Sequence, residues 1–295
     1  MRIVLAGASG LIGTALCASL REAGHTVTVL VRRPARSADE SQWDPQRDQL
    51  DPGVLAGVDA VVCLSGAGVG DHRWSEAYRR TLVRSRVDPV ATLSRALVES
   101  GGPRVLLTAS AVGYYGDTGD REVTESAGPG SGFLAELCVQ WEAASAPARD
   151  AGVRVSQLRT GLVLSGDGGL LKRLKPLVRA GVAGRLGSGR QFMPWLSLAD
   201  EVRAILFLLE HDVVGPVNLT GPVPVRNGEF MATLGRVLHR PTVLPTPGFA
   251  LRIALGEFAS ATLAGQRALP GQLVDAGFRH EHAELESALR WALRR

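Results

Sequence analysis

The most restrictive feature of this sequence is a glycine-rich turn close to its N-terminus. Residues 7–13 read GASGLIG, directly after the apolar run Arg2–Ala6 and directly before a stretch of helical character. Gly7 permits a tight turn, Gly10 lets a pyrophosphate approach the backbone, and Gly13 lets the helix pack closely on the strand. The first N–H groups of such a helix are free to bind phosphate. We therefore predict a dinucleotide site at Gly7, Ser9, Gly10, Leu11, Ile12 and Gly13.

Strands and helices alternate through the first half of the chain. After the first strand, short apolar or β-branched runs recur at Thr26–Val31, 60–64, 104–108 and 153–158. Such continuous runs are typical of parallel strands that are buried on both faces. Helical stretches are expected at about 75–100, 133–150 and 198–211. The alternation predicts an α/β fold with a doubly wound parallel sheet of the Rossmann type.

The pattern changes after about residue 166, where glycines and prolines interrupt a mainly helical tail. We interpret this part as a smaller lobe that closes over the substrate. The expected division is an NADP-binding Rossmann domain of residues 1–165, to which 190–220 return, and a substrate and C-terminal lobe of residues 166–189 and 221–295.

The end of the second strand indicates which nucleotide is bound. An NAD site places Asp or Glu there to bind the ribose 2′-hydroxyl, but residues 31–34 read VRRP. Arginine guanidinium groups match phosphate well. We therefore predict NADP(H), with Arg32 as the first candidate for the 2′-phosphate, Arg33 as the second, and Val31 beside them. The alternative is that both arginines are solvated loop residues.

Two further loops follow strands of the predicted sheet, where ligands of open α/β sheets bind. Leu64 ends the strand at 60–64, and Ser65 and Gly66 follow it in a loop whose small residues allow the adenosine to pass close to the backbone of Leu64 and Ser65. Val163 follows the strand at 153–158 and is expected near the nicotinamide. With these four residues, the predicted cofactor site is complete as far as the motifs and their spacing indicate it.

Composition excludes several other classes of function. The net charge is +4, but the arginines are scattered along helices without a dense basic stripe, which argues against nucleic-acid binding. The cysteines and histidines are scattered too, so no metal site is expected. No apolar run approaches the ~20 residues of a membrane span, and no secretory leader is evident. We expect a cytoplasmic protein with a small-molecule substrate and no membrane partner.

Several motifs together resemble a known family. GASGLIG, SAVGYYGDTG, WEAA, LRTGLVLS, GSGRQFMPW and NLTGP are similar to segments of the atypical extended short-chain dehydrogenase/reductases, in particular the epimerase-family group with a short C-terminal helical domain. The resemblance runs from residue 1 to about 292. It implies a Rossmann fold, NADP(H) binding and a substrate lobe, and it suggests that Arg86 reaches the cofactor. It also raises the possibility of a homodimer.

Ordinary members of that superfamily transfer protons with a Ser, Tyr and Lys set. Ser110 matches the serine, just past the strand at 104–108. The helix from residue 133 should then carry Tyr-x-x-x-Lys, but it contains neither residue type. The Tyr position is Phe133 or Leu134, and the Lys position is accordingly Leu137 or Cys138. The usual proton relay is therefore absent.

A different group would have to transfer the proton if the protein is an enzyme. Tyr115 follows Ser110 and could supply it, although a phenol with a pKa near 10 would need activation. The alternative is that Tyr115 only shapes the pocket. Glu136 and Glu142, on the helix from residue 133, could also act as acid or base. The leading hypothesis is an NADP(H)-dependent oxidoreductase or epimerase-like enzyme with Ser110 and Tyr115 as catalytic residues. The alternative is a non-catalytic NADP(H)-binding sensor or regulatory protein that acts through a partner.

Overall fold

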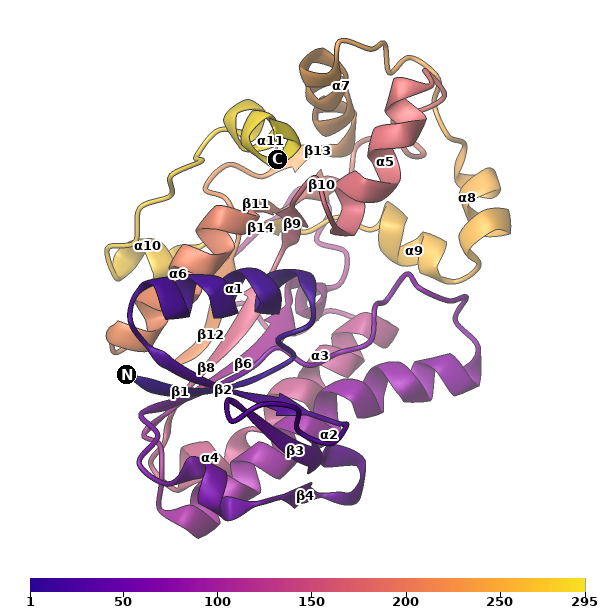
Figure 1. Ribbon diagram of the computed structural model, residues 1–295. Helices are drawn as coiled ribbons and strands as arrows, with labels where there is room; N and C mark the ends of the chain where they lie inside the picture. The colour runs from indigo at the N-terminus through magenta and orange to yellow at the C-terminus, as the bar shows by residue number, and fades with distance from the viewer. Residues whose placement is uncertain (295) are drawn as a thin grey trace.

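A computed structural model describes residues 1–294 and shows an eight-stranded sheet in the order β12-β8-β6-β5-β1-β2-β3-β4 (Figure 1). Every neighbouring pair is parallel except β3 and β4. This order, which reverses beside β1, is that of a doubly wound Rossmann sheet and confirms the predicted fold class. The strands of the sheet are β1 (Arg2–Ala6), β2 (Thr26–Val31), β3 (Glu40–Asp44), β4 (Gln49–Leu50), β5 (Ala60–Cys63), β6 (Val105–Ala111), β8 (Arg154–Thr160) and β12 (Gly215–Leu219).

Helices cover both faces of this sheet. On one face, Ile3 and Leu5 of β1 pack in a cluster with α1 (Leu11–Glu22) and α6 (Leu198–Glu210). On the other face, Val4 and Ala6 pack in a cluster with α2 (Glu76–Ser100), α3 (Phe133–Ala143) and α4 (Ala146–Asp150). Alternate side chains of one strand thus reach two cores, which explains why the four residues of β1 after Arg2 are all apolar.

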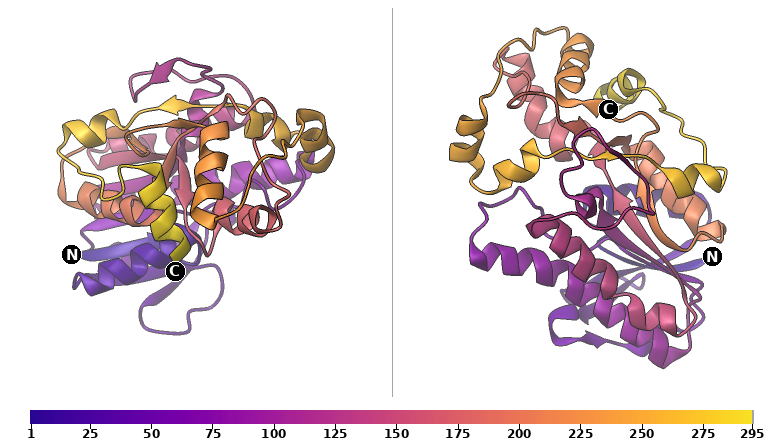
Figure 2. Two further views of the ribbon diagram at one scale, coloured as in Figure 1. Left: turned by 90° about the horizontal axis from the view of Figure 1, so that it is seen from above. Right: turned by 180° about the vertical axis from the view of Figure 1, so that it is seen from behind.

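The later segments gather beyond the carboxyl ends of the strands (Figure 1; Figure 2, right). A third core joins α5 (Gly169–Arg179), α7 (Asn227–Leu238) and α11 (Leu285–Arg294). Three small strand pairs brace this part: β9 (Leu162–Leu164) with β11 (Trp195–Ser197), β10 (Phe192–Met193) with β13 (Val225–Arg226), and β7 (Glu122–Val123) with β14 (Arg267–Ala268). The remaining helices are α8 (Gly248–Leu255), α9 (Phe258–Leu263) and α10 (Gly271–Asp275).

The structure differs from the sequence-based expectation at β3 and β4 and at the expected helix 133–150. The strand β3 was not predicted, because its sequence ESQWD is polar and only Trp43 is fully buried. The expected helix at 133–150 is two helices, since α3 ends at Ala143 and α4 starts at Ala146. Neither difference moves a predicted site residue away from the carboxyl edge of the sheet.

Candidate functional site

The glycine turn after β1 has no room for side chains at two of its three glycines. Gly7 has φ +86°, and a Cβ there would lie 2.6 Å from the carbonyl carbon of Leu64. A Cβ on Gly13 would lie 2.2 Å from the Gly7 carbonyl oxygen. Gly10 is different, because the nearest atom to its Cβ position is 3.5 Å away and no side chain caps the helix that it precedes. The N-terminus of α1 is therefore accessible to an anion.

The two arginines after β2 have different environments. The guanidinium of Arg33 donates two hydrogen bonds to the carboxylate of Glu40, at 2.7 and 2.6 Å. These bonds lower the pKa of Glu40 to about 2. Arg32 is exposed, and within residues 1–294 its guanidinium has no hydrogen bond or ion pair. Arg32 is therefore free to bind a phosphate, whereas Arg33 neutralises a carboxylate that the sequence analysis did not anticipate at this strand end.

Arg86 lies beneath the loop that follows β5. It is buried, and its guanidinium donates to the carbonyl oxygens of Ala67 at 2.8 Å and Leu82 at 3.1 Å. Its guanidinium carbon lies 5.2 Å from the ring centroid of Trp141, and a Cβ on Gly66 would lie 3.3 Å from that carbon. Burial lowers the pKa of Arg86. Because no carboxylate in the described part of the chain pairs with it, its charge favours an anion near this loop.

The segment after Val163 lies beside the glycine turn. Val163 is half-buried in β9, and the chain turns at Gly168 just beyond it. A Cβ on Gly168 would lie 2.7 Å from a methyl carbon of Leu11 at the start of α1. The fold thus brings the segment after Val163 to the glycine turn, across more than 150 residues of sequence.

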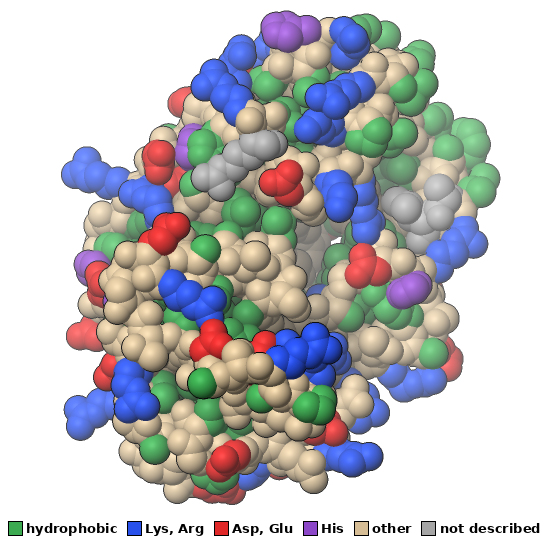
Figure 3. Space-filling view, in the orientation of Figure 1, with side chains coloured by type: hydrophobic (Ala, Val, Ile, Leu, Met, Phe, Trp, Pro, Cys, Tyr) green, Lys and Arg blue, Asp and Glu red, His purple; other side chains and the backbone are tan. Residues whose placement is uncertain are grey.

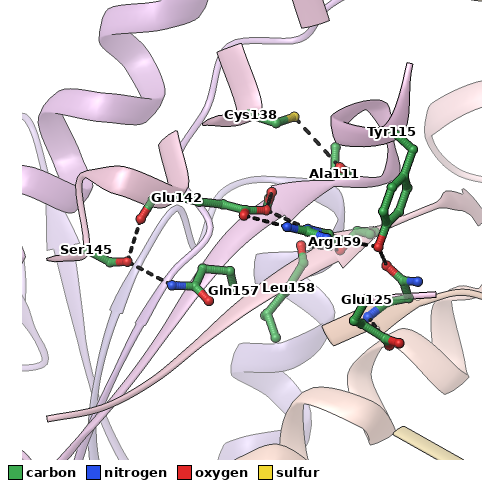
Figure 4. A network of polar contacts seen from close by, with 12 residues as sticks. Ala111, Tyr115, Glu125, Cys138, Glu142, Ser145, Gln157, Leu158 and Arg159 are labelled. Atoms are coloured by element: carbon green, nitrogen blue, oxygen red, sulfur yellow. Dashed lines mark hydrogen bonds and ion pairs between the residues drawn. The ribbon is translucent and has the colours of Figure 1, made fainter. Parts of the chain in front are cut away.

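The predicted catalytic hydroxyl groups belong to an internal polar network (Figure 4). Ser110 is buried and donates to Glu142 at 2.6 Å, and Glu142 makes a two-fold ion pair with Arg159, with both N–O distances 2.8 Å. Tyr115 is 2% exposed; its hydroxyl donates to Asn218 at 2.7 Å and accepts from Arg159 at 3.0 Å. Burial raises the pKa of Tyr115, although the Arg159 hydrogen bond opposes this. Both hydroxyl hydrogens therefore have partners within the protein.

The positions of the missing Tyr and Lys are apolar or nearly so. Leu134 lies next to Gly113: a Cβ added to Gly113 would be 3.5 Å from the Cβ of Leu134. One turn further along α3, the Cys138 thiol donates to the Ala111 carbonyl oxygen, 3.7 Å away. Burial raises the pKa of Cys138 to about 12, so this thiol stays protonated. These contacts favour Leu134 and Cys138, of the pairs left open by the sequence, as the residues at the two positions.

Contacts that the sequence does not predict join the start of α2 to the C-terminal lobe. Figure 3 shows the surface hollowed between the Rossmann part and the C-terminal lobe. Near the start of α2, Trp74 lies 5.1 Å from Phe133 and 5.5 Å from Phe258, measured between ring centroids. Arg79 forms an ion pair with Glu257. These partners are more than 55 residues from Trp74 or Arg79 in sequence, so no local pattern could reveal them.

The described residues contain no group of three or more His, Cys, Asp or Glu side chains placed to hold a metal ion. Across residues 1–294, no helix combines the length and apolarity needed to cross a bilayer. The geometry thus defines a dinucleotide-binding Rossmann protein whose reactive edge lacks the usual Tyr and Lys.

Comparison with known proteins identifies the family. Residues 3–219 match the NAD dependent epimerase/dehydratase family, and residues 246–292 match a domain of unknown function. An epimerase family protein of Mycobacterium bovis is 50% identical and spans 99% of this chain and 98% of its own. A chloroplastic epimerase family protein of Arabidopsis thaliana is 35% identical over 98% of this chain and 86% of its own. The chain therefore belongs to the NAD dependent epimerase/dehydratase family, as the resemblance predicted.

Solved structures agree with this assignment. The human epimerase family protein SDR39U1, solved with NADPH, superposes with a TM-score of 0.92 at 29% identity and covers 100% of this chain and 99% of its own. A nucleoside-diphosphate sugar epimerase from Corynebacterium glutamicum superposes with a TM-score of 0.82 at 32% identity, over 99% of this chain and 58% of its own.

Proposed function

We propose that this protein binds NADP(H) in preference to NAD(H). The observation that carries the proposal is the free guanidinium of Arg32 at the end of β2. Glu40, the carboxylate that could otherwise bind a ribose 2′-hydroxyl there, is bound by Arg33. The human relative solved with NADPH supports the same choice. The glycine turn and the open N-terminus of α1 would hold the pyrophosphate, and the bound cofactor would supply a hydride at its nicotinamide.

The first test is a fluorescence titration with NADPH and NADH. We expect Arg32→Ala to weaken NADPH binding by about tenfold to a hundredfold, because charge-assisted hydrogen bonds contribute ~1.5–3 kcal/mol, and to leave NADH binding unchanged. The control is Arg149→Ala. It removes an exposed arginine of α4, which lies near the amino ends of the strands, away from the predicted cofactor site. Equal affinities of the wild type for the two cofactors would contradict the proposal.

We further propose what the protein does once NADP(H) is bound. It does not use the cofactor for tyrosine-dependent proton transfer and serves as a cofactor-responsive regulatory protein. This is the alternative hypothesis from the sequence. It is favoured because Ser110 and Tyr115 are buried with both hydroxyl hydrogens bonded internally. A catalytic phenol must instead be within reach of the proton that it transfers. Under this proposal, Ser110 and Tyr115 support the strand ends and do not touch a substrate.

A substrate screen tests the proposed regulatory role. NADPH absorbance is followed with a panel of carbonyl compounds, and nucleoside-diphosphate sugars are examined for epimerisation by NMR, since one structural relative is described as an epimerase of such sugars. We expect no turnover above the protein-free rate. Turnover that is lost in Tyr115→Phe or Ser110→Ala, with NADPH binding intact, would establish the leading sequence hypothesis of an enzyme instead.

A further inference from the structure

The C-terminal lobe exposes a group of apolar side chains that no other element covers within the described chain. They are 48% to 77% exposed and comprise Leu177, Val182, Val243, Leu244, Phe249 and Ile253. Most of the remaining exposed large apolar residues are scattered over other elements, which is ordinary for a protein surface. Six such residues on neighbouring segments are not, because contiguous apolar patches mark interaction sites.

These six residues lie on adjoining segments. The amide of Val182 donates to the carbonyl of Leu177 at 3.1 Å. The segment after Val182 pairs with the one that holds Val243 and Leu244, through bridges from Gly184 to Val243 and from Leu186 to Thr246. The helix α8 follows at once, and its Phe249 and Ile253 are four residues apart and so share one face. Figure 3 shows apolar side chains gathered along this flank, over α5 and α8.

The same segments carry only positive charge. Residues 168–190 contain six basic residues and no acidic one, and residues 239–256 contain two arginines and no acidic one. Two acidic groups beside these segments have partners, since Asp71 pairs with Arg173 and Glu257 with Arg79, and a third, Asp167, directly precedes the first segment. The basic residues are Lys172, Arg173, Lys175, Arg179, Arg185, Arg190, Arg240 and Arg252. We call these residues and the six apolar ones the basic–apolar surface.

The positive charge of the basic–apolar surface favours an anionic partner over a second copy of the chain. A second copy docked by two-fold symmetry would bring like charges together, which disfavours self-association. The cavities of about 630 Å³ beside β3 and β4 and about 370 Å³ beside α6 are lined by none of these side chains. Exposed Phe, Leu, Ile and Val side chains on segments that also carry Lys and Arg match the interface of an anionic bilayer.

We propose that the basic–apolar surface attaches the protein to the surface of an anionic lipid bilayer. The apolar side chains of α8 and of the adjoining loop enter the headgroup region, while the arginines and lysines bind lipid phosphates. This attachment is peripheral, and it revises the sequence-based expectation of no membrane partner, which rested on the lack of a spanning segment. It does not depend on cofactor binding.

Co-sedimentation with vesicles tests the proposal on the full chain. Vesicles of phosphatidylcholine with phosphatidylglycerol are compared with vesicles of phosphatidylcholine alone, at two salt concentrations. We expect sedimentation with the anionic vesicles only, weakened by salt. Phe249→Glu with Ile253→Glu should lower the partition coefficient about tenfold or more, and so should Arg179→Glu with Arg185→Glu.

The control is Val98→Glu with Val214→Glu, which adds the same charge at two exposed valines of the Rossmann part. It should bind vesicles only slightly less than the wild type. Thermal unfolding of every variant separates loss of binding from loss of fold. Equal binding to both vesicle types, no binding to either, or binding to soluble polyglutamate in place of vesicles would overturn the proposal, the last in favour of an acidic protein partner.

Discussion

At the scale of single residues, the fold gives chemically similar neighbours different roles. Arg32 and Arg33 are adjacent in sequence, yet only Arg33 has a carboxylate partner, because β3 brings Glu40 beside it. Ser110 and Tyr115 were predicted as catalytic from their place after β6. Their partners Glu142, Arg159 and Asn218 come from α3, β8 and β12, so their burial could not be seen in the local sequence.

Glu201 gives a residue-scale prediction. Its side chain on α6 is fully buried, Thr160 donates to one carboxyl oxygen at 2.9 Å, and the other oxygen has no partner in the described chain. Burial raises the pKa of Glu201 from 4.5 to about 8. Between those pH values the unfolded chain ionises while the folded chain stays protonated. The stability contributed by the neutral acid is therefore full below about pH 4.5 and is lost as the pH rises towards 8.

We expect Glu201→Gln to remove this dependence. The difference in unfolding free energy between variant and wild type should grow by about 1.4 kcal/mol per pH unit from pH 5 to 8, as the wild type weakens. Urea unfolding at several pH values in that range measures it. Glu136→Gln, at an exposed position of α3, is the control and should follow the wild type. Parallel curves for Glu201→Gln and wild type would show that the carboxyl titrates normally.

At the scale of elements, the start of α6 binds the segment before α11 through hydrogen bonds and so holds it against the Rossmann part. Ser197 caps this helix, and the buried carboxylate of Asp200 accepts the backbone N–H groups of Glu281 at 2.8 Å and His282 at 2.9 Å. Burial acts to raise the pKa of Asp200, but these hydrogen bonds outweigh it and lower the pKa. One side chain thus positions the chain that leads into α11.

Asp200→Asn tests this element. An amide cannot accept all of these hydrogen bonds, so we expect a loss of about 2–4 kcal/mol in unfolding free energy and faster proteolysis near residues 280–284. Urea unfolding and limited proteolysis followed by mass spectrometry measure the two effects. Asp212→Asn, just beyond the same helix and with a fully exposed side chain, should change neither. A stable variant with an unchanged cleavage pattern would show that Asp200 is dispensable for docking.

At the scale of the whole molecule, the two parts meet around the carboxyl edge of the sheet (Figure 2). The glycine turn, the loop over Arg86 and the segment after Val163 converge there from one side. The ion pair of Arg79 with Glu257 and the contact of Trp74 with Phe258 join the start of α2 to the C-terminal lobe. The predicted domain division, a cytoplasmic location and a homodimer stay predictions.

The Rossmann fold and the family can be predicted without a structure, because a glycine turn between a strand and a helix and the apolar pattern of buried strands are local properties of the chain. The sequence also indicated correctly that α3 carries no Tyr or Lys. Three features could be read only from the folded chain: which arginine is free, which hydroxyl groups are buried, and where exposed apolar and basic side chains lie on adjoining segments. Each of those outcomes depends on partners that lie on other elements, from β3 beside Arg33 to Asn218 beside Tyr115. Hydrogen bonds and burial between distant segments leave no periodic signal in the sequence.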